Sequence, residues 1–259
     1  MINAIDHVVI LVNDLDAAIA DYRVLGFTVV PGGEHADGLS HNALISLADG
    51  SYLELIAFKR PPPDEHLFAQ GYRAGEGIVT FALLPTDIAN DLKEIRARGL
   101  EMDGPFPGGR MRPDSRRVEW QTATPRTPDL PFLCADVTPR ELRVPGGDAI
   151  HHDNGAIGIS EITLAVTDLA ASRQRYRALL ATDPIEFTSD VIRFTLGGAS
   201  IDLFDLSYDD ETDLPDDDLP DIRDEPIALT LYAKKESSAD VAKFGVRGVI
   251  LALEYLPAT

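Results

Sequence analysis

The sequence predicts an α+β protein built from tandem β-α-β-β-β units that pair into two modules, with the last unit abbreviated. Three observations predict this fold. Residues 5–15 (IDHVVILVNDL) recur as residues 159–169 (ISEITLAVTDL), which is a clear internal repeat. A weaker copy begins at residue 78 and an abbreviated one at residue 226. In the first three copies, an aliphatic strand pattern changes to apolar residues at helical spacing.

Each full unit is expected to begin with a strand that leads directly into a helix. The strands end at Asp14, Asp87 and Asp168. Aspartate is a good N-cap because its side chain accepts hydrogen bonds from the free amides of the first helical turn. Gly26 and Gly99 stand where the first two helices should end, as is typical of the residue after a helix.

Antiparallel strands are expected after each helix. Residues 41–58 contain the turn signal Asp49-Gly50, and residues 190–206 contain Gly197-Gly198. A sheet covered by one helix leaves a bare face, so two units must pair to bury it around a central cavity. The fourth unit, residues 226–255, is expected to hold a strand, a short helix and one closing strand.

Four units suggest two domains. The first spans residues 1–140 and is expected to hold the main cavity. A linker at residues 141–154, with Pro145 and Gly146-Gly147, should join it to a second, degenerate module at residues 155–259.

Composition narrows the class of protein. The 259 residues carry 43 acidic and 23 Lys or Arg side chains, a net charge of -20 that disfavours nucleic acid and anionic membranes as partners. No apolar run is long enough to span a membrane, and the first residues carry no signal-peptide pattern. A single cysteine cannot form an intrachain disulfide. We therefore expect an acidic cytoplasmic protein.

The absence of certain short motifs argues against two further classes of protein. The sequence contains no P-loop, no G-x-G-x-x-G and no G-x-S-x-G. We therefore expect no nucleotide cofactor and no serine-hydrolase chemistry.

Two polar residues interrupt apolar strands of the first module. His7 lies in the first strand of the first unit, and Glu54 lies in the run Tyr-Leu-Glu-Leu-Ile of its last strand. A carboxylate buried without a partner is costly, and the repeat places these two residues opposite each other. A contact between His7 and Glu54 would explain why both occur in apolar strands, and it favours a functional role for the pair over a structural one.

Three stretches carry a family resemblance: residues 41–44 (HNAL), 50–56 (GSYLELI) and 152–156 (HDNGA). Together with the repeat, they resemble the vicinal-oxygen-chelate superfamily, which includes glyoxalases, bleomycin-resistance proteins and extradiol dioxygenases, and within it the glyoxalase-like subgroup. The resemblance covers nearly the whole chain. It implies one small-molecule cavity per pair of units and, in many relatives, a homodimer.

The resemblance also implies a metal inside the cavity. His7 and Glu54 hold two ligand places, which suit Zn, Fe, Mn, Ni or Co as divalent ions. In the partner unit, Thr80 and Phe132 hold the corresponding places and cannot supply a carboxylate or an imidazole.

Other residues are needed to complete such a site. His41 or His152 is expected to act as third ligand or proton shuttle, with Glu54 as the base. His35 and His66 lie in polar, loop-like stretches and are expected to be solvated.

In the second module, Glu161 and Asp202 take the places of His7 and Glu54. We expect these two carboxylates to line that module without binding a metal.

Residues for substrate binding are also indicated. Asn42 begins a strand beside the cavity, and Arg116 belongs to an arginine cluster that suggests an anionic substrate. The sole tryptophan, Trp120, follows at once and is expected to wall the pocket.

Three functions remain open. The first is a metal-assisted lyase or isomerase acting on a small anionic, oxygen-rich metabolite. The second is a metal-free protein that binds and sequesters a small molecule. The third is an extradiol-type dioxygenase, which requires two histidines and one carboxylate on iron.

Overall fold

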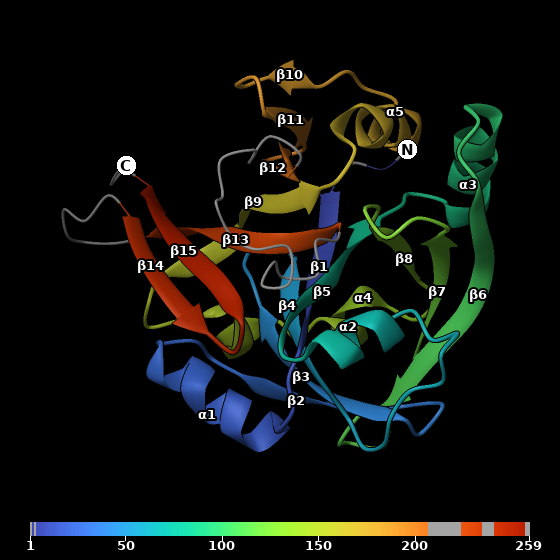
Figure 1. Cartoon of the computed structure of the whole chain (residues 1–259). Coiled ribbons are helices and arrows are strands. Elements are labelled where there is room, and N and C mark those ends of the chain that lie inside the picture. Colours follow the sequence, from blue (N-terminus) through green and yellow to red (C-terminus); the bar gives the residue numbers. More distant parts are fainter. Residues whose placement is uncertain (1, 3, 207–223, 235–240, 257–259) are drawn as a thin grey trace.

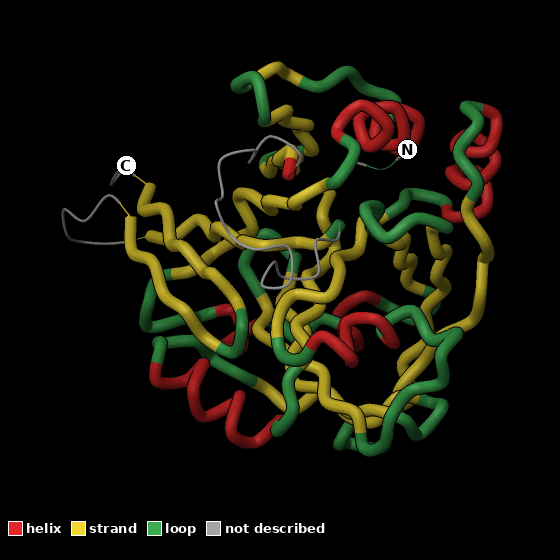
Figure 2. Tube along the Cα trace, viewed as in Figure 1, coloured by secondary structure: helices red, strands yellow, loops and turns green. Residues whose placement is uncertain are grey.

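The chain folds into two β-sheets with short helices around them (Figures 1 and 2). The computed structural model describes residues 2, 4–206, 224–234 and 241–256. The predicted fold class is confirmed, because the two sheets are built from paired β-α-β-β-β units. No helix among the described residues is long and apolar enough to cross a membrane.

The first sheet closes into a barrel of eight strands in the order β1-β4-β3-β2-β6-β7-β8-β5. Its strands are β1 (Ala4–Leu11), β2 (Val30–His35), β3 (Ser40–Ser46), β4 (Tyr52–Phe58), β5 (Gly77–Leu84), β6 (Met102–Met111), β7 (Arg117–Pro125) and β8 (Phe132–Asp136). In both units, the first strand pairs in parallel with the last, β1 with β4 and β5 with β8. β1 and β5 pair antiparallel and so join the two units.

The second sheet has seven strands in the order β10-β11-β12-β9-β13-β15-β14 and stays open. Its strands are β9 (Ala156–Val166), β10 (Ile185–Glu186), β11 (Val191–Leu196), β12 (Ala199–Asp205), β13 (Glu225–Lys234), β14 (Val241–Val246) and β15 (Val249–Leu256). The same parallel pairing recurs between β9 and β12 and between β13 and β15. In the fourth unit, two strands, β14 and β15, follow β13 where one closing strand was expected. Residues 235–240, between β13 and β14, lie outside the described residues, and so does any part of the expected short helix that falls on them.

The three long helices begin where the aspartate pattern predicted. They are α1 (Leu15–Val24), α3 (Ile88–Ala97) and α5 (Leu169–Leu180). Asp14, Asp87 and Asp168 are their N-caps, and each side chain accepts a hydrogen bond from a backbone amide of the first turn.

One hydrophobic core runs through both modules. It includes Val8 and Ile10 of β1 together with Ile162 and Leu164 of β9. Since strand side chains alternate, burying Val8 and Ile10 against this core points His7, Val9 and Leu11 to the barrel interior.

The segment expected to be a linker is folded. It holds α4 (Arg140–Arg143) and a 3-10 turn at Gly147–Ile150. Arg143 and Val144 are both buried. A further short helix, α2 (Ala69–Ala74), lies between β4 and β5.

Candidate active site in the first barrel

Glu54 of β4 is the buried carboxylate at the centre of the candidate site. Its side chain accepts a hydrogen bond of 2.5 Å from Nδ2 of Asn42 on β3. The Nε2 atoms of two histidines approach different carboxylate oxygens: His7 lies 3.5 Å from Oε2, and His35 lies 3.4 Å from Oε1. Burial alone would raise the pKa of Glu54, but the neighbouring His35, His7 and Asn42 side chains outweigh it and lower the pKa to about 2. Glu54 is therefore ionised.

His7 is fixed on all sides. Its Nδ1 atom lies 2.7 Å from Oδ2 of Asp6. The ring of Tyr52 stacks on the imidazole at a centroid distance of 4.5 Å, and Phe132 meets it edge-on at 5.4 Å. Phe132, which holds the ligand place of the partner unit, therefore contacts His7 through an aromatic ring that cannot bind a metal.

Asp6 belongs to a buried ion-pair network that reaches α4. Arg143 donates to both of its oxygens, and Arg140 lies 2.7 Å from Oδ1. Burial raises the pKa of Asp6, but Arg143 and His7 more than offset this, so the pKa falls well below its usual range. Asp6 is thus a permanent anion in the barrel.

His35 is a neighbour of Glu54 that the sequence did not predict. It ends β2, where Nδ1 lies 2.9 Å from Oγ of Ser40 and the ring meets Trp120 edge-on. Its side chain is 17% exposed, not solvated as expected. A register shift between Pro31 and Gly33 re-aims this part of β2. The Gly32-Gly33 pair inside a strand was the available signal.

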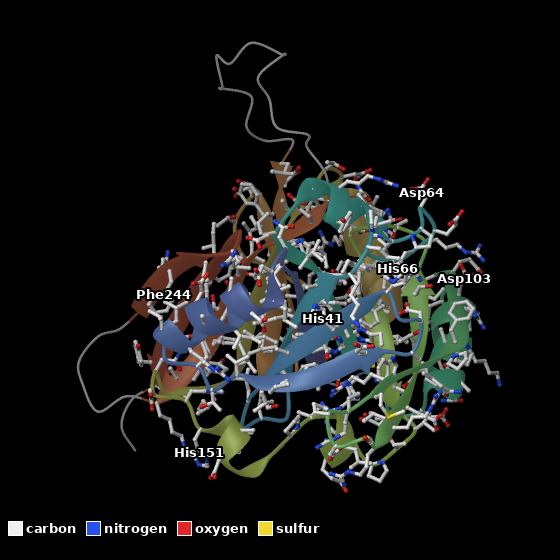
Figure 3. All side chains as sticks on the ribbon, turned by 90° about the horizontal axis from the view of Figure 1, so that it is seen from below. His41, Asp64, His66, Asp103, His151 and Phe244 are labelled. Atoms are coloured by element: carbon white, nitrogen blue, oxygen red, sulfur yellow. The ribbon has the colours of Figure 1, made fainter. Side chains whose placement is uncertain are left out.

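His41 and His152 are not among the contacts of Glu54. His41, which is labelled in Figure 3, lies on the face of β3 opposite to Asn42, because consecutive strand residues alternate. The Nδ1 atom of His152 accepts from the amide of Thr28, and its Nε2 atom donates to the carbonyl of Ser46. Both ring nitrogens of His152 are thus engaged in tying the segment after α4 to the first module.

Of the three predicted substrate-binding residues, two lie near Glu54 or His35 and one does not. Asn42 contacts Glu54, and Trp120 packs at the barrel interior beside His35. Arg116 is exposed and paired with Asp114, away from these contacts. Arg110 is instead the buried arginine of the cluster, and it donates to the carbonyls of Gly32 and Arg143.

The charge of Arg110 bears on what the barrel can bind. Among the described residues, no carboxylate lies within ion-pair distance of its guanidinium. Burial lowers the pKa of Arg110, while the nearby Tyr52 and Glu54 partly restore it. A guanidinium whose hydrogen-bond partners are backbone carbonyls keeps its positive charge uncompensated, which favours binding of an anion nearby.

The remaining interior of the barrel is apolar. Glu54 and His7 lie among six buried hydrophobic residues and four partly exposed aromatic ones: Val9, Leu11, Ile56, Ala82, Phe132, Cys134, and Phe58, Phe68, Tyr72, Trp120. Such surroundings strengthen electrostatic interactions at the polar centre.

Two residue sets come into question as metal ligands. Ligand atoms of Asp6, His7 and Cys134 all lie within 4.8 Å of one another. However, both oxygens of Asp6 are already bound by Arg143, and burial raises the pKa of Cys134 above its ordinary value. Two guanidinium groups beside Asp6 would also repel a cation.

His7, Glu54 and His35 form the second set, and an imidazole pair with a carboxylate suits a divalent transition-metal ion. The two Nε2 atoms lie 3.5 and 3.4 Å from different oxygens of Glu54, so in this structure one ligand atom from each residue does not fall within 4.8 Å of the other two. Each histidine also has its other ring nitrogen anchored, as is usual for metal ligands. Because the two histidines approach different oxygens, binding by all three requires a side-chain rotation, for which the part-exposed His35 is best placed.

In the second module, the described residues at the corresponding places form an ion-pair cluster. At the corresponding places, Glu161 and Asp202 are bridged by the guanidinium of Arg193. The arginine supplies the positive charge that the two neighbouring carboxylates need.

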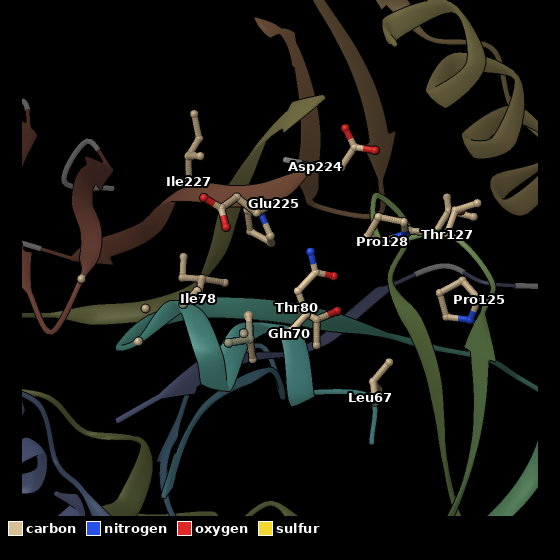
Figure 4. Close-up of a pocket in the computed structure, with 18 of the residues that line it drawn as sticks. Leu67, Gln70, Ile78, Thr80, Pro125, Thr127, Pro128, Asp224, Glu225 and Ile227 are labelled. Atoms are coloured by element: carbon tan, nitrogen blue, oxygen red, sulfur yellow. The ribbon is translucent and has the colours of Figure 1, made fainter. Parts of the chain in front are cut away.

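A separate cleft of about 550 Å³ lies between the two modules (Figure 4). It is lined by parts of α2, β5, β13 and the segment after β7. Its described lining contains no histidine or cysteine. Of its four charged residues, Arg126, Glu76, Asp224 and Glu225, the first two are paired with Asp103 and Arg247, respectively. The barrel interior is therefore the better candidate for chemistry.

Comparisons with known proteins agree with this architecture. The model of the family described as "Glyoxalase-like domain" matches residues 5–180. No curated protein matches the sequence significantly. A hypothetical protein from Staphylococcus aureus has a similar fold, with a TM-score of 0.77 at 15% identity over 97% of this chain and 99% of the other.

Two further solved structures share the fold. A fusion of a xylose isomerase-like TIM barrel with 4-hydroxyphenylpyruvate dioxygenase has a TM-score of 0.60 at 13% identity, over 91% of this chain and 37% of its own. A mutant of 4-hydroxymandelate synthase from Streptomyces coelicolor has a TM-score of 0.59 at 13% identity, over 90% and 72%. Identities this low carry information about the fold alone.

Proposed function

Because the chain belongs to the glyoxalase-like domain family of the vicinal-oxygen-chelate superfamily, we propose that its first barrel is the site of a metal-assisted lyase or isomerase. The substrate is a small, oxygen-rich anion. One observation chiefly supports this: an ionised, buried Glu54 is approached by two histidines whose Nδ1 atoms are already engaged.

In this proposal, His7, Glu54 and His35 hold a divalent ion. A bound ion of this kind acts as a Lewis acid that stabilises negative charge on substrate oxygens. Asn42 fixes the orientation of Glu54 through its amide. The apolar wall with Phe132 and Trp120 excludes water, and the charge of Arg110 attracts an anionic substrate.

A dioxygenase is a second candidate, favoured by the position of His35 as a second histidine beside Glu54. Two histidines and one carboxylate with open positions are typical of non-haem iron oxygenases. A metal-free binding protein is a third, favoured by Thr80 and Phe132 at the places where two further ligands would be expected.

Parallel assays separate the three functions. Protein loaded in turn with Zn, Mn, Ni, Co or Fe is incubated with 2-oxo acids and hemithioacetals, while products are followed by NMR and oxygen by an electrode. The proposal predicts turnover without oxygen consumption, lost on chelation and in Glu54→Gln, and kept in Asp202→Asn. Turnover that consumes oxygen would establish the dioxygenase. Chelator-insensitive thermal stabilisation by one of these compounds, without turnover, would establish the binding protein.

A further inference from the structure

We propose that Arg143 of α4 is a positioning residue that, through Asp6, fixes the tautomer and orientation of His7. The segment that follows the eight barrel strands thus completes the site within the barrel. The inference rests on the proposed metal-binding role of His7 but can be tested without any metal.

The contact between α4 and β1 is buried and bidentate. Arg143 is 2% exposed and Asp6 is 0% exposed. Nη1 of Arg143 donates to Oδ2 of Asp6 at 2.6 Å, and Nη2 donates to Oδ1 at 3.0 Å. A two-point pair of this kind defines the orientation of the carboxylate as well as its charge. A second arginine of α4, Arg140, lies 2.7 Å from Oδ1.

A backbone irregularity turns Asp6 toward its neighbour. Consecutive residues of a regular strand face opposite sides, yet Asp6 and His7 touch. The register between β1 and β5 shifts between Ile5 and His7, which is a bulge at Asp6. The carboxylate can therefore reach both the imidazole of His7 and the guanidinium of Arg143.

An ionised carboxylate only accepts hydrogen bonds, so Nδ1 of His7 must carry the proton. The lone pair of a neutral His7 is then on Nε2, which is the atom that lies 3.5 Å from Glu54. Arg143 also donates to the hydroxyl of Tyr52, whose ring stacks on His7. One guanidinium thus holds both residues that orient the imidazole.

Replacing Asp6 by asparagine tests the tautomer directly. Oδ1 of Asp6 faces two guanidinium groups and Oδ2 faces one, so the new amide nitrogen should take the Oδ2 position and donate to Nδ1 of His7. Nitrogen-15 NMR of metal-free protein, recorded at an alkaline pH where the spectra show a neutral His7 ring, should show protonated Nδ1 in the wild type and protonated Nε2 in Asp6→Asn. Unprotonated Nδ1 in the wild type, or no change in the variant, would overturn the proposal.

A matched pair of arginine variants separates positioning from stability. Arg143→Met removes the partner of buried Asp6, and Arg175→Met removes the partner of Asp129, which is also 0% exposed but lies at the junction of the modules. We expect Arg143→Met to raise the Kd for Zn by about 10- to 100-fold, and Arg175→Met to leave it within about twofold. Equal affinities in folded variants would overturn the positioning role. Absence of Zn binding by the wild type would contradict the proposed function, while the tautomer result would still decide the role of Asp6 and Arg143.

Discussion

Glu54 stays ionised in an apolar barrel because polar groups from three other positions surround it. Removing an ion from water costs several kcal/mol unless partners compensate. Asn42, His7 and His35 provide that compensation, and the pKa of about 2 expresses its result. The same neighbours that stabilise the carboxylate could hold a cation beside it.

His35 and His41 form a natural test pair, since they lie on adjacent strands and only His35 approaches Glu54. We expect His35→Ala to raise the Kd for Zn at least about tenfold, because a ligand is lost. His41→Ala should change it by less than about twofold. Isothermal titration of both variants checks this, and the reverse order of effects would restore His41 to the site.

The part of the candidate site that the sequence predicted is the part that the repeat aligns. His7 and Glu54 hold equivalent places in first and last strands, so their proximity followed from the β1–β4 pairing. The position of His35 could not be predicted in this way. The direction of its side chain depends on a register shift in β2, and the hydrophobic pattern of the flanking residues does not indicate that shift. The role of Arg143 could not be predicted from the sequence either, because its partner Asp6 is more than a hundred residues away along the chain.

At the scale of elements, strands and long helices were predictable, whereas the connecting segment was not. The repeated aspartates mark the starts of α1, α3 and α5. Residues 141–154, expected to be a linker, pack as the end of α4 and a 3-10 turn. Their order comes from tertiary contacts, namely Arg143 with Asp6 and His152 with two backbone groups.

The connection through His152 should make stability depend on pH. Burial lowers the pKa of His152 below the ordinary value of 6.5. The unfolded chain therefore takes up this proton first, so His152 should contribute a loss of stability as pH falls below about 6.5. Urea midpoints between about pH 7.5 and 5.5 should fall more steeply in the wild type than in His152→Gln. Parallel pH curves for the two proteins would show that His152 does not contribute.

At the scale of the whole molecule, one hydrophobic core supports two sheets that differ in closure. The first closes into a barrel around Glu54, whereas the second stays open around the Arg193 ion pairs. The repeat predicted both sheets, because each unit needs a partner to cover its bare face. Closure of one and not the other could not be predicted, since both sheets arise from units with the same sequence pattern. The expected homodimer remains a prediction.

The most direct test of the central claim is the metal content of the purified, tag-free protein, measured by mass spectrometry after exposure to several divalent ions. The account predicts about one bound transition-metal ion per chain, lost in Glu54→Ala and retained in Asp202→Ala, the equivalent position of the second sheet. Metal that stays in Glu54→Ala, or no metal in any of the three proteins, would contradict a metal site in the first barrel.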